Sequence, residues 1–386
     1  MTELARRGLL PAGLRDVLPP EADQEASVIQ RLLAVCAGYG YRAVKPPLVE
    51  FEDSLLAGSG AAMGPSMFRV MDPVSQRMLA LRADMTLQIA RIAATRLKKL
   101  PRPLRLSYAG EVLRVKGDEL RPERQFGQVG AELIGSDSPA ADAEAVLLAA
   151  EALEAVNVRN LSVDLSSPRL APALITAAGL DDEAAGRVRA ALDRKEQSAV
   201  KRLAKGAGAT LVELLKASGP ADGVLKTLSR LDLPEEAAAE ARRLAEVVGL
   251  IRAAAPKLSL TIDPVEMRGF EYHTGLCFTL FARRVRGEIG RGGRYLAGEA
   301  LAPGNGESST GFTLYMDSIM RALPEAEAAK RLFLPFGTLP GTARTWRESG
   351  WITIAGLEAG NPAAEAKRLA CTHLLVDGAP RDINQV

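Results

Sequence analysis

Apolar positions along the chain recur with a helical spacing in some segments and form short runs typical of strands in others. The helical spacing predicts long helices over 20–38, 86–97 and 140–156. Strand-like runs lie over 42–49, 68–71, 77–81, 105–116, 125–135, 258–262, 275–282 and 287–290. The segment 311–323 begins as a strand and ends as a helix. Helices and antiparallel strands therefore alternate without a repeat.

Two parts of the chain have a different character. Residues 168–257 are dominated by Ala, Leu, Glu, Lys and Arg and are interrupted by glycines, which predicts several short helices inserted into the fold. Residues 326–386 alternate strand and helix on a small scale. We therefore expect a core domain over 1–325 that is interrupted by the helical insertion, followed by a small α/β domain.

Composition restricts the class of protein. The 386 residues carry a net charge of only +2, which argues against wrapping around RNA. The three cysteines lie far apart and there are two histidines, so we expect no metal site and a reduced, cytoplasmic setting. The sequence contains no apolar run of about 18 residues, so a membrane span is not expected. We expect no cofactor.

The run from Arg268 to Gly275 carries the chemistry of a pocket for free histidine. The guanidinium of Arg268 is a planar fork that fits a carboxylate. Glu271, Tyr272 and His273 offer polar atoms for the two nitrogens of an imidazole. Such a pocket suits an enzyme that uses histidine or a sensor that measures it.

Further motifs point to the same family of proteins. The run from Arg268 to Gly275 resembles the histidine-specific motif of histidyl-tRNA synthetases. Three other segments resemble signatures of class II aminoacyl-tRNA synthetases, namely 38–50, 81–86 and 114–132. The fold implied by this resemblance is an α+β class II core, an antiparallel sheet flanked by helices, with a truncated C-terminal unit.

The resemblance also implies roles for single residues. It places Phe126 against adenine, Arg114 on the α-phosphate of ATP and Gln128 on the substrate amino group. Asp84 stands where the family has a Glu that holds the ammonium, although it also fits an N-terminal cap of the following helix. Residues 292–295 resemble a strand turn in which Tyr295 fills the pocket floor, or an ordinary hairpin turn.

The chain departs from the synthetases at the ATP site. Ser318 stands where the third class II signature has an Arg for the γ-phosphate, and a neutral hydroxyl cannot neutralise a leaving pyrophosphate. Lys116 stands where the second signature has a Glu, and the loop after it is acidic. The tail is too short for a full tRNA-binding domain. The pocket for the amino acid is thus kept while the means to activate it are lost.

This combination resembles the regulatory subunits of ATP phosphoribosyltransferase. The resemblance implies a chain without catalytic residues that supports a short-form catalytic subunit and relays inhibition by free histidine. It also implies a homodimer core within a larger hetero-oligomer, and no tRNA partner. The expected contacts to the effector histidine are Asp84, Gln128, Arg268, Glu271, Tyr272, His273 and Tyr295. Arg114 and Arg124 are the expected residues of a residual anion site.

Some alternatives stay open from the sequence. Arg114 could bind an anion or could be an internal ion-pair partner now that Lys116 replaces the Glu. The chain could be a working histidyl-tRNA synthetase, a module that senses uncharged tRNA, or a ligase that attaches an amino acid to a protein. Each of these rivals needs an ATP site or a basic surface that the sequence does not supply.

Overall fold

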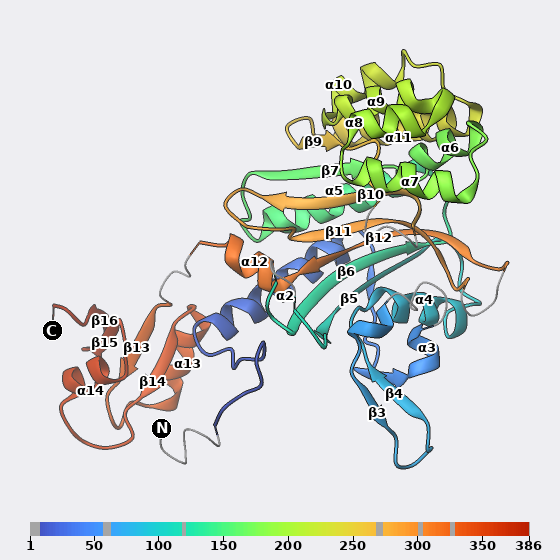
Figure 1. Ribbon diagram of the computed structural model, residues 1–386. Coiled ribbons are helices and arrows are strands. Elements are labelled where there is room, and N and C mark those ends of the chain that lie inside the picture. Colours follow the sequence, from blue (N-terminus) through green and yellow to red (C-terminus); the bar gives the residue numbers. More distant parts are fainter. Residues whose placement is uncertain are drawn as a thin grey trace. The chain divides into compact units, whose positions relative to one another are not determined.

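The computed structural model describes residues 8–56, 63–117, 121–267, 273–299, 304–324 and 329–385. The chain divides into two compact units, Met1–Leu323 and Pro324–Val386. Figure 1 shows the elements of both units.

In its described part, the first unit is built on a nine-stranded sheet with the order β1-β5-β6-β12-β11-β10-β7-β9-β8. Its strands are β1 (Arg42–Ala43), β5 (Leu104–Leu113), β6 (Gln125–Ile134), β7 (Leu161–Ser166), β8 (Gly219–Pro220), β9 (Ser259–Ile262), β10 (His273–Ala282), β11 (Gly290–Ala297) and β12 (Glu307–Tyr315). The six central strands pair antiparallel, whereas β1 joins β5 and β9 joins β7 in parallel. The expected antiparallel sheet is confirmed, with a parallel pair near each edge.

The two faces of this sheet have separate hydrophobic cores, because side chains alternate along a strand. Phe312 and Leu314 of β12 pack into the larger core, while Tyr315 packs into the smaller one. The larger core includes α2 (Glu21–Gly38), α5 (Pro139–Ala155) and α11 (Glu235–Ala254). The smaller core lies against α4 (Thr86–Thr95). The α4 face carries the candidate site described below.

Between β7 and β9 the chain is mostly helical, and these helices gather above the sheet in Figure 1. They are α6 (Leu170–Ala177), α7 (Asp182–Asp193), α8 (Gln197–Leu203), α9 (Gly208–Ala217), α10 (Ala221–Leu228) and α11, with the short β8 among them. Helix α11 packs on α5, and an ion pair holds the two helices together. The carboxylate of buried Asp142 in α5 accepts from Arg243 of α11 at 3.0 Å and pairs with Arg294 of β11 at 2.8 Å.

A three-stranded sheet, β2-β4-β3, lies beside α3 (Glu52–Leu56). It contains β2 (Val49–Phe51), β3 (Arg69–Met71) and β4 (Met78–Leu81). The single strand expected over 42–49 is wrong, since β1 and β2 are separate strands in different sheets. Pro46 and Pro47 explain the break, because proline has no amide hydrogen to donate to a neighbouring strand.

Two other expectations need correction. Residues 292–295 form no turn, because they lie inside β11, paired with β10 on one side and β12 on the other. The glycines there allow close approach of side chains from neighbouring strands. In the second unit, the expected strands and helices are followed by an additional strand, β16 (Ala379–Asp382), which pairs antiparallel with β15.

The second unit is a four-stranded sheet of order β14-β13-β15-β16 with two short helices. Its other elements are β13 (Arg331–Leu334), α13 (Pro340–Glu348), β14 (Ile352–Ala355), α14 (Pro362–Arg368) and β15 (His373–Val376). Across the residues that the structure describes, no helix has both the length and the apolar character needed to cross a bilayer.

Close packing at Gly311 generates a stability prediction. A methyl group on Gly311 of β12 would overlap the carboxylate of Glu132 on β6 and the main chain of Ala131. We expect Gly311→Ala to lower the free energy of unfolding by about 1–3 kcal/mol, as overpacking of a buried site does. Gly249→Ala in α11 is the control, since nothing lies within 4 Å there and alanine favours a helix. Denaturant unfolding measures both; equal stability of Gly311→Ala and wild type would contradict the packing argument.

Candidate functional site

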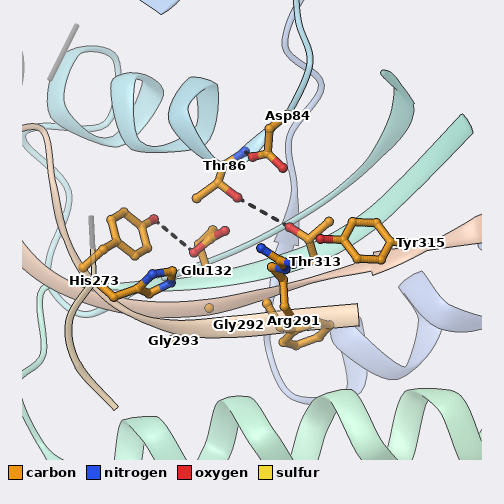
Figure 2. Close-up of a pocket in the computed structure, with 12 residues that line it drawn as sticks. Asp84, Thr86, Glu132, His273, Arg291, Gly292, Gly293, Thr313 and Tyr315 are labelled. Carbon is orange, nitrogen blue, oxygen red and sulfur yellow. Dashed lines mark hydrogen bonds between the residues drawn. The ribbon is translucent and has the colours of Figure 1, made fainter. Parts of the chain in front are cut away.

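A cleft opens on the α4 face of the main sheet, between the start of α4 and the middle of the strands. It encloses about 320 Å³ of non-atom space, including its open mouth. Residues of α4, β6, β10, β11 and β12 line it, and Figure 2 shows their side chains converging. The lining residues are Asp84, Thr86, Glu132, His273, Arg291, Gly292, Gly293, Tyr295, Gly311, Phe312, Thr313 and Tyr315.

Asp84 is held in place at the upper wall of the cleft in Figure 2. Its Oδ1 accepts from the amide of Thr86 at 2.8 Å, and its Oδ2 accepts from Gln128 Nε2 at 3.0 Å. The amide of Met85 in turn donates to Gln128 Oε1 at 3.1 Å. Asp84 thus supports the start of α4 and lines the cleft. Gln128 is completely buried behind Asp84 and does not itself line the cleft, so its contact with a ligand stays a prediction.

Glu132 forms the floor of the cleft and is 1% exposed. The hydroxyl of Tyr295 donates to its Oε2 at 3.0 Å, and the hydroxyl of Tyr108 donates to its Oε1 at 3.3 Å. Burial and, to a smaller extent, the charge of Asp84 raise the pKa of the Glu132 carboxyl to about 8, against the hydrogen bond from Tyr295, which lowers it. Glu132 is therefore a neutral acid at neutral pH.

Sequence analysis did not single out Glu132 as a site residue. The available signal was its position, because it is the one carboxylate in the apolar strand β6. Nor did the sequence point to the hydroxyls that surround it. Thr86 Oγ1 lies 3.3 Å from the Tyr108 hydroxyl, which lies 2.8 Å from Thr313 Oγ1. These groups give the cleft wall donors and acceptors within a buried setting.

The structure brings three of the predicted effector contacts to this cleft: Asp84, His273 and Tyr295. His273 opens β10 opposite Tyr295 of β11, and its ring occupies space that a side chain on Gly293 would fill, with Cδ2 2.6 Å from the position of such a Cβ. Arg268, Glu271 and Tyr272 lie outside the described residues. In the part of the chain that is described, no cluster of His, Cys, Asp or Glu is placed to hold a metal ion.

At the other end of the site, aromatic rings are covered by the protein's own cations. The Arg121 guanidinium lies 3.8 Å from the centroid of the Tyr315 ring and 5.8 Å from that of Phe126. Arg114 lies 5.0 Å from the Phe126 centroid. Glu288 fixes this arrangement, accepting from Arg121 at 2.6 Å and from Arg291 at 2.7 Å. Phe126 is buried, so the face that the synthetase resemblance assigns to adenine is already in contact with side chains.

The two residues of the expected anion site differ in their surroundings. Arg124 fixes the N-terminal segment: its Nη1 donates to the carbonyl of Ala12 at 3.1 Å, and its side chain packs where Gly13 leaves room. Arg114 Nε is buried without a hydrogen-bond partner among the described residues. Ser318 in α12 (Met316–Ala322) is 1% exposed, and its Oγ accepts from Arg321 at 3.1 Å.

Comparisons with known proteins agree on one family. The sequence model of the histidyl-tRNA synthetase family matches residues 13–319. The chain is 56% identical to an ATP phosphoribosyltransferase regulatory subunit of Paramagnetospirillum magneticum, over 97% of this chain and 98% of that protein. It is 54% identical to the protein of the same description from Rhodospirillum centenum, over 97% and 96%.

A solved structure has the same fold. It is described as an ATP phosphoribosyltransferase regulatory subunit/histidyl-tRNA synthetase from Bacillus halodurans, and it superposes with a TM-score of 0.82 over 95% of this chain and 97% of that one. The sequence identity is 23%, so this likeness shows the fold alone.

The raised pKa of Glu132 predicts a pH-dependent stability. The unfolded carboxyl ionises near pH 4.3 but the folded one near pH 8, so the folded state binds more protons between these values. The free energy of unfolding therefore falls through this group as pH rises from about 5 to about 8. We expect Glu132→Gln, which cannot ionise, to gain thermal stability relative to wild type as pH rises from about 5 to about 8. Exposed Glu236→Gln is the control. A wild-type-to-variant difference in Tm that does not change with pH would show that Glu132 ionises normally.

Proposed function

The chain belongs to the family of ATP phosphoribosyltransferase regulatory subunits, and we propose that it activates the short-form catalytic subunit of that enzyme and makes it sensitive to inhibition by free histidine. Relatives that match the chain over nearly their whole length are named as regulatory subunits of this enzyme. The chain is thus a non-catalytic subunit, and the proposal concerns what it binds and how it acts.

The observation that carries the proposal is the pair of carboxyl groups in the cleft. The Asp84 side chain offers two acceptor oxygens fixed by two donors, and an acidic side chain in this position suits a ligand ammonium. Glu132 is buried and neutral, so its proton can be donated to an imidazole nitrogen that carries a lone pair. Tyr295 and His273 lie at the same end of the cleft as Glu132. Free histidine has both of these groups on one small molecule.

The ligand carboxylate needs a cation as well. We propose that Arg268 supplies it, with Glu271 and Tyr272 beside the imidazole and Gln128 acting on the ammonium through Asp84. Arg114, which has an unpaired buried Nε among the described residues, would be a residual site for an anion. These assignments rest on the motif from Arg268 to Gly275 and on the bond between Gln128 and Asp84.

The nucleotide end of the site supports a role without adenylation. Arg121 lies over Tyr315 and pairs with Glu288, and Phe126 is buried against Arg114. ATP would have to displace these contacts, and Ser318 would leave the leaving pyrophosphate without a cation. A protein that binds histidine but cannot activate it can report the histidine concentration to a partner.

Relay to the partner requires that histidine bind one state of the assembly more tightly than another. A coupling free energy of about 1–3 kcal/mol is sufficient for feedback control. We propose a homodimer core within a larger hetero-oligomer with the catalytic subunit, in the cytoplasm. In this assembly 1–325 would be the ligand-binding core, 168–257 its helical insertion and 326–386 a separate small domain.

Isothermal titration calorimetry of the chain, alone and with its catalytic subunit, tests the effector site. We expect histidine to bind the wild type and Asp84→Asn to weaken binding by about 10-fold to 100-fold, because a charged contact contributes about 1.5–3 kcal/mol. The exposed Asp232→Asn is the matched control. Catalytic assays of the mixture should show activation by the chain and inhibition by histidine. Absence of heat in both titrations would rule out the sensor.

A pyrophosphate-exchange assay tests the loss of adenylation. We expect no histidine-dependent exchange from the wild type, and none from Ser318→Arg, because the added cation does not uncover Phe126 and Tyr315. Clear exchange by the wild type would identify a working synthetase instead. Exchange gained by Ser318→Arg alone would show that the covered rings do not block the nucleotide.

A further inference from the structure

The turn between β10 and β11 carries three exposed arginines: Arg283, Arg284 and Arg286. None of them has an ion-pair partner among the described residues. Other arginines of the chain do pair with carboxylates, among them Arg15, Arg69, Arg91, Arg102, Arg105, Arg121, Arg243, Arg291 and Arg294. The turn thus presents concentrated positive charge that the chain itself does not neutralise.

A fourth arginine lies beside this turn. The amide of Arg283 donates to the carbonyl of Asn160 at 3.3 Å, which places the turn against the segment that leads into β7. Arg159 precedes Asn160, is exposed, and donates only to the neutral side chain of Asn157 in the described structure. We name Arg159, Arg283, Arg284 and Arg286 the arginine edge.

The arginine edge borders a groove. Asn160 and Leu161 form one side of this groove, which encloses about 1260 Å³ of non-atom space including its open face. The rest of its lining comes from α2, α5 and α11 and from the segment after α11, and it combines apolar side chains with Glu151, Glu154 and Lys257. The lining residues are Tyr39, Leu147, Ala150, Glu151, Glu154, Asn160, Leu161, Ala254, Ala255, Pro256, Lys257 and Leu258. Protein–protein interfaces likewise combine apolar side chains with charged ones.

We propose that the arginine edge and this groove dock the catalytic subunit through an acidic segment of that partner; the inference rests on the proposed function, because it takes the existence of the partner from it. Charge complementarity selects the partner. The neighbouring carboxylates cannot satisfy the arginines, since Glu288 is held by Arg121 and Arg291, and Glu151 accepts from the Tyr39 hydroxyl. In a two-fold symmetric contact, a second copy of the chain would set the same arginines against one another. The partner must therefore bring the carboxylates.

The same surroundings favour a protein over a nucleic acid. Glu151 and Glu154 on α5 line the groove and repel negative charge, so the groove takes uncharged side chains of the partner and only the arginine edge takes its acidic segment, whereas a chain of phosphates is charged throughout. A nucleic acid also needs basic groups spread along a track, whereas these arginines are confined to one end of the sheet. Arginine is enriched in protein interfaces because it joins charge to a large apolar contact.

Biolayer interferometry with the purified catalytic subunit tests this surface. The variant carries Arg283→Glu, Arg284→Glu and Arg286→Glu together, and its control carries Arg189→Glu, Arg202→Glu and Arg230→Glu, which are exposed arginines of the helical segment. We expect the first variant to raise the Kd for the catalytic subunit at least about 10-fold, mainly by slowing association, and the control to leave it within about 2-fold. Wild-type binding should weaken between about 0.1 M and about 1 M salt, and the variant should lose that dependence.

Further measurements separate the possible failures. Histidine calorimetry and circular dichroism check that the variants are folded, and a milder triple change of the same residues to Gln should give a smaller effect in the same direction. No binding of the catalytic subunit by wild type would defeat the proposed function itself. Normal binding by the triple Glu variant would defeat only the docking surface. Loss of self-association in that variant, or loss of tight tRNA binding shown by the wild type, would reassign the arginine edge to a second copy or to phosphates.

Discussion

The ion pair between Asp142 and Arg294 is the contact on which the arrangement of the first unit depends. Asp142 of α5 and Arg294 of β11 are both buried. A buried charge is tolerated only with a partner and further hydrogen bonds, and Arg294 has both, since it also donates to the carbonyl of Ser136 and to the hydroxyl of Ser308. Arg294 lies between Gly293 and Tyr295, which line the cleft on the opposite face of β11. The ion pair between Asp142 and Arg294 therefore fixes the register of β11. A strand that slipped by one residue would exchange its two faces and leave a guanidinium in an apolar core.

Two side chains of α11, in the helical insertion, make polar contacts that lead to the strands of the cleft. Arg243 of α11 donates to Asp142, and Glu240, one turn earlier, accepts from Ser167 at 2.7 Å and lies 3.6 Å from Arg169. Arg169 then donates to the carbonyl of Thr274, next to His273. The insertion is therefore fastened to both strands that bring His273 and Tyr295 together. At the other end of the cleft, Arg121 lies over Tyr315, so the protein's own side chains occupy the end that the synthetase resemblance assigns to a nucleotide.

The sequence predicted what periodicity and local chemistry determine. It predicted the long helices, the β5–β6 pair and the α+β class, and it identified Asp84 and Tyr295 as residues of one site. It failed where tertiary contacts decide. Residues 292–295 look like a turn because glycine is common in turns, yet here glycine serves close packing between β10, β11 and β12. Glu132 was passed over because only the fold reveals that it is enclosed, and the bond between Gln128 and Asp84 was not foreseen because the two residues are 44 positions apart.

The glycines that surround the cleft affect how variation in this protein should be interpreted. A Cβ at Gly293 would crowd His273, one at Gly130 would crowd Tyr108, and one at Gly311 would crowd Glu132. These positions contribute no functional group, yet they shape the volume in which the functional groups sit. In a saturation-mutagenesis map they would look as intolerant as residues that touch a ligand. Intolerance at such sites would record the need for empty space, so a genetic screen alone would overcount the chemistry of this cleft.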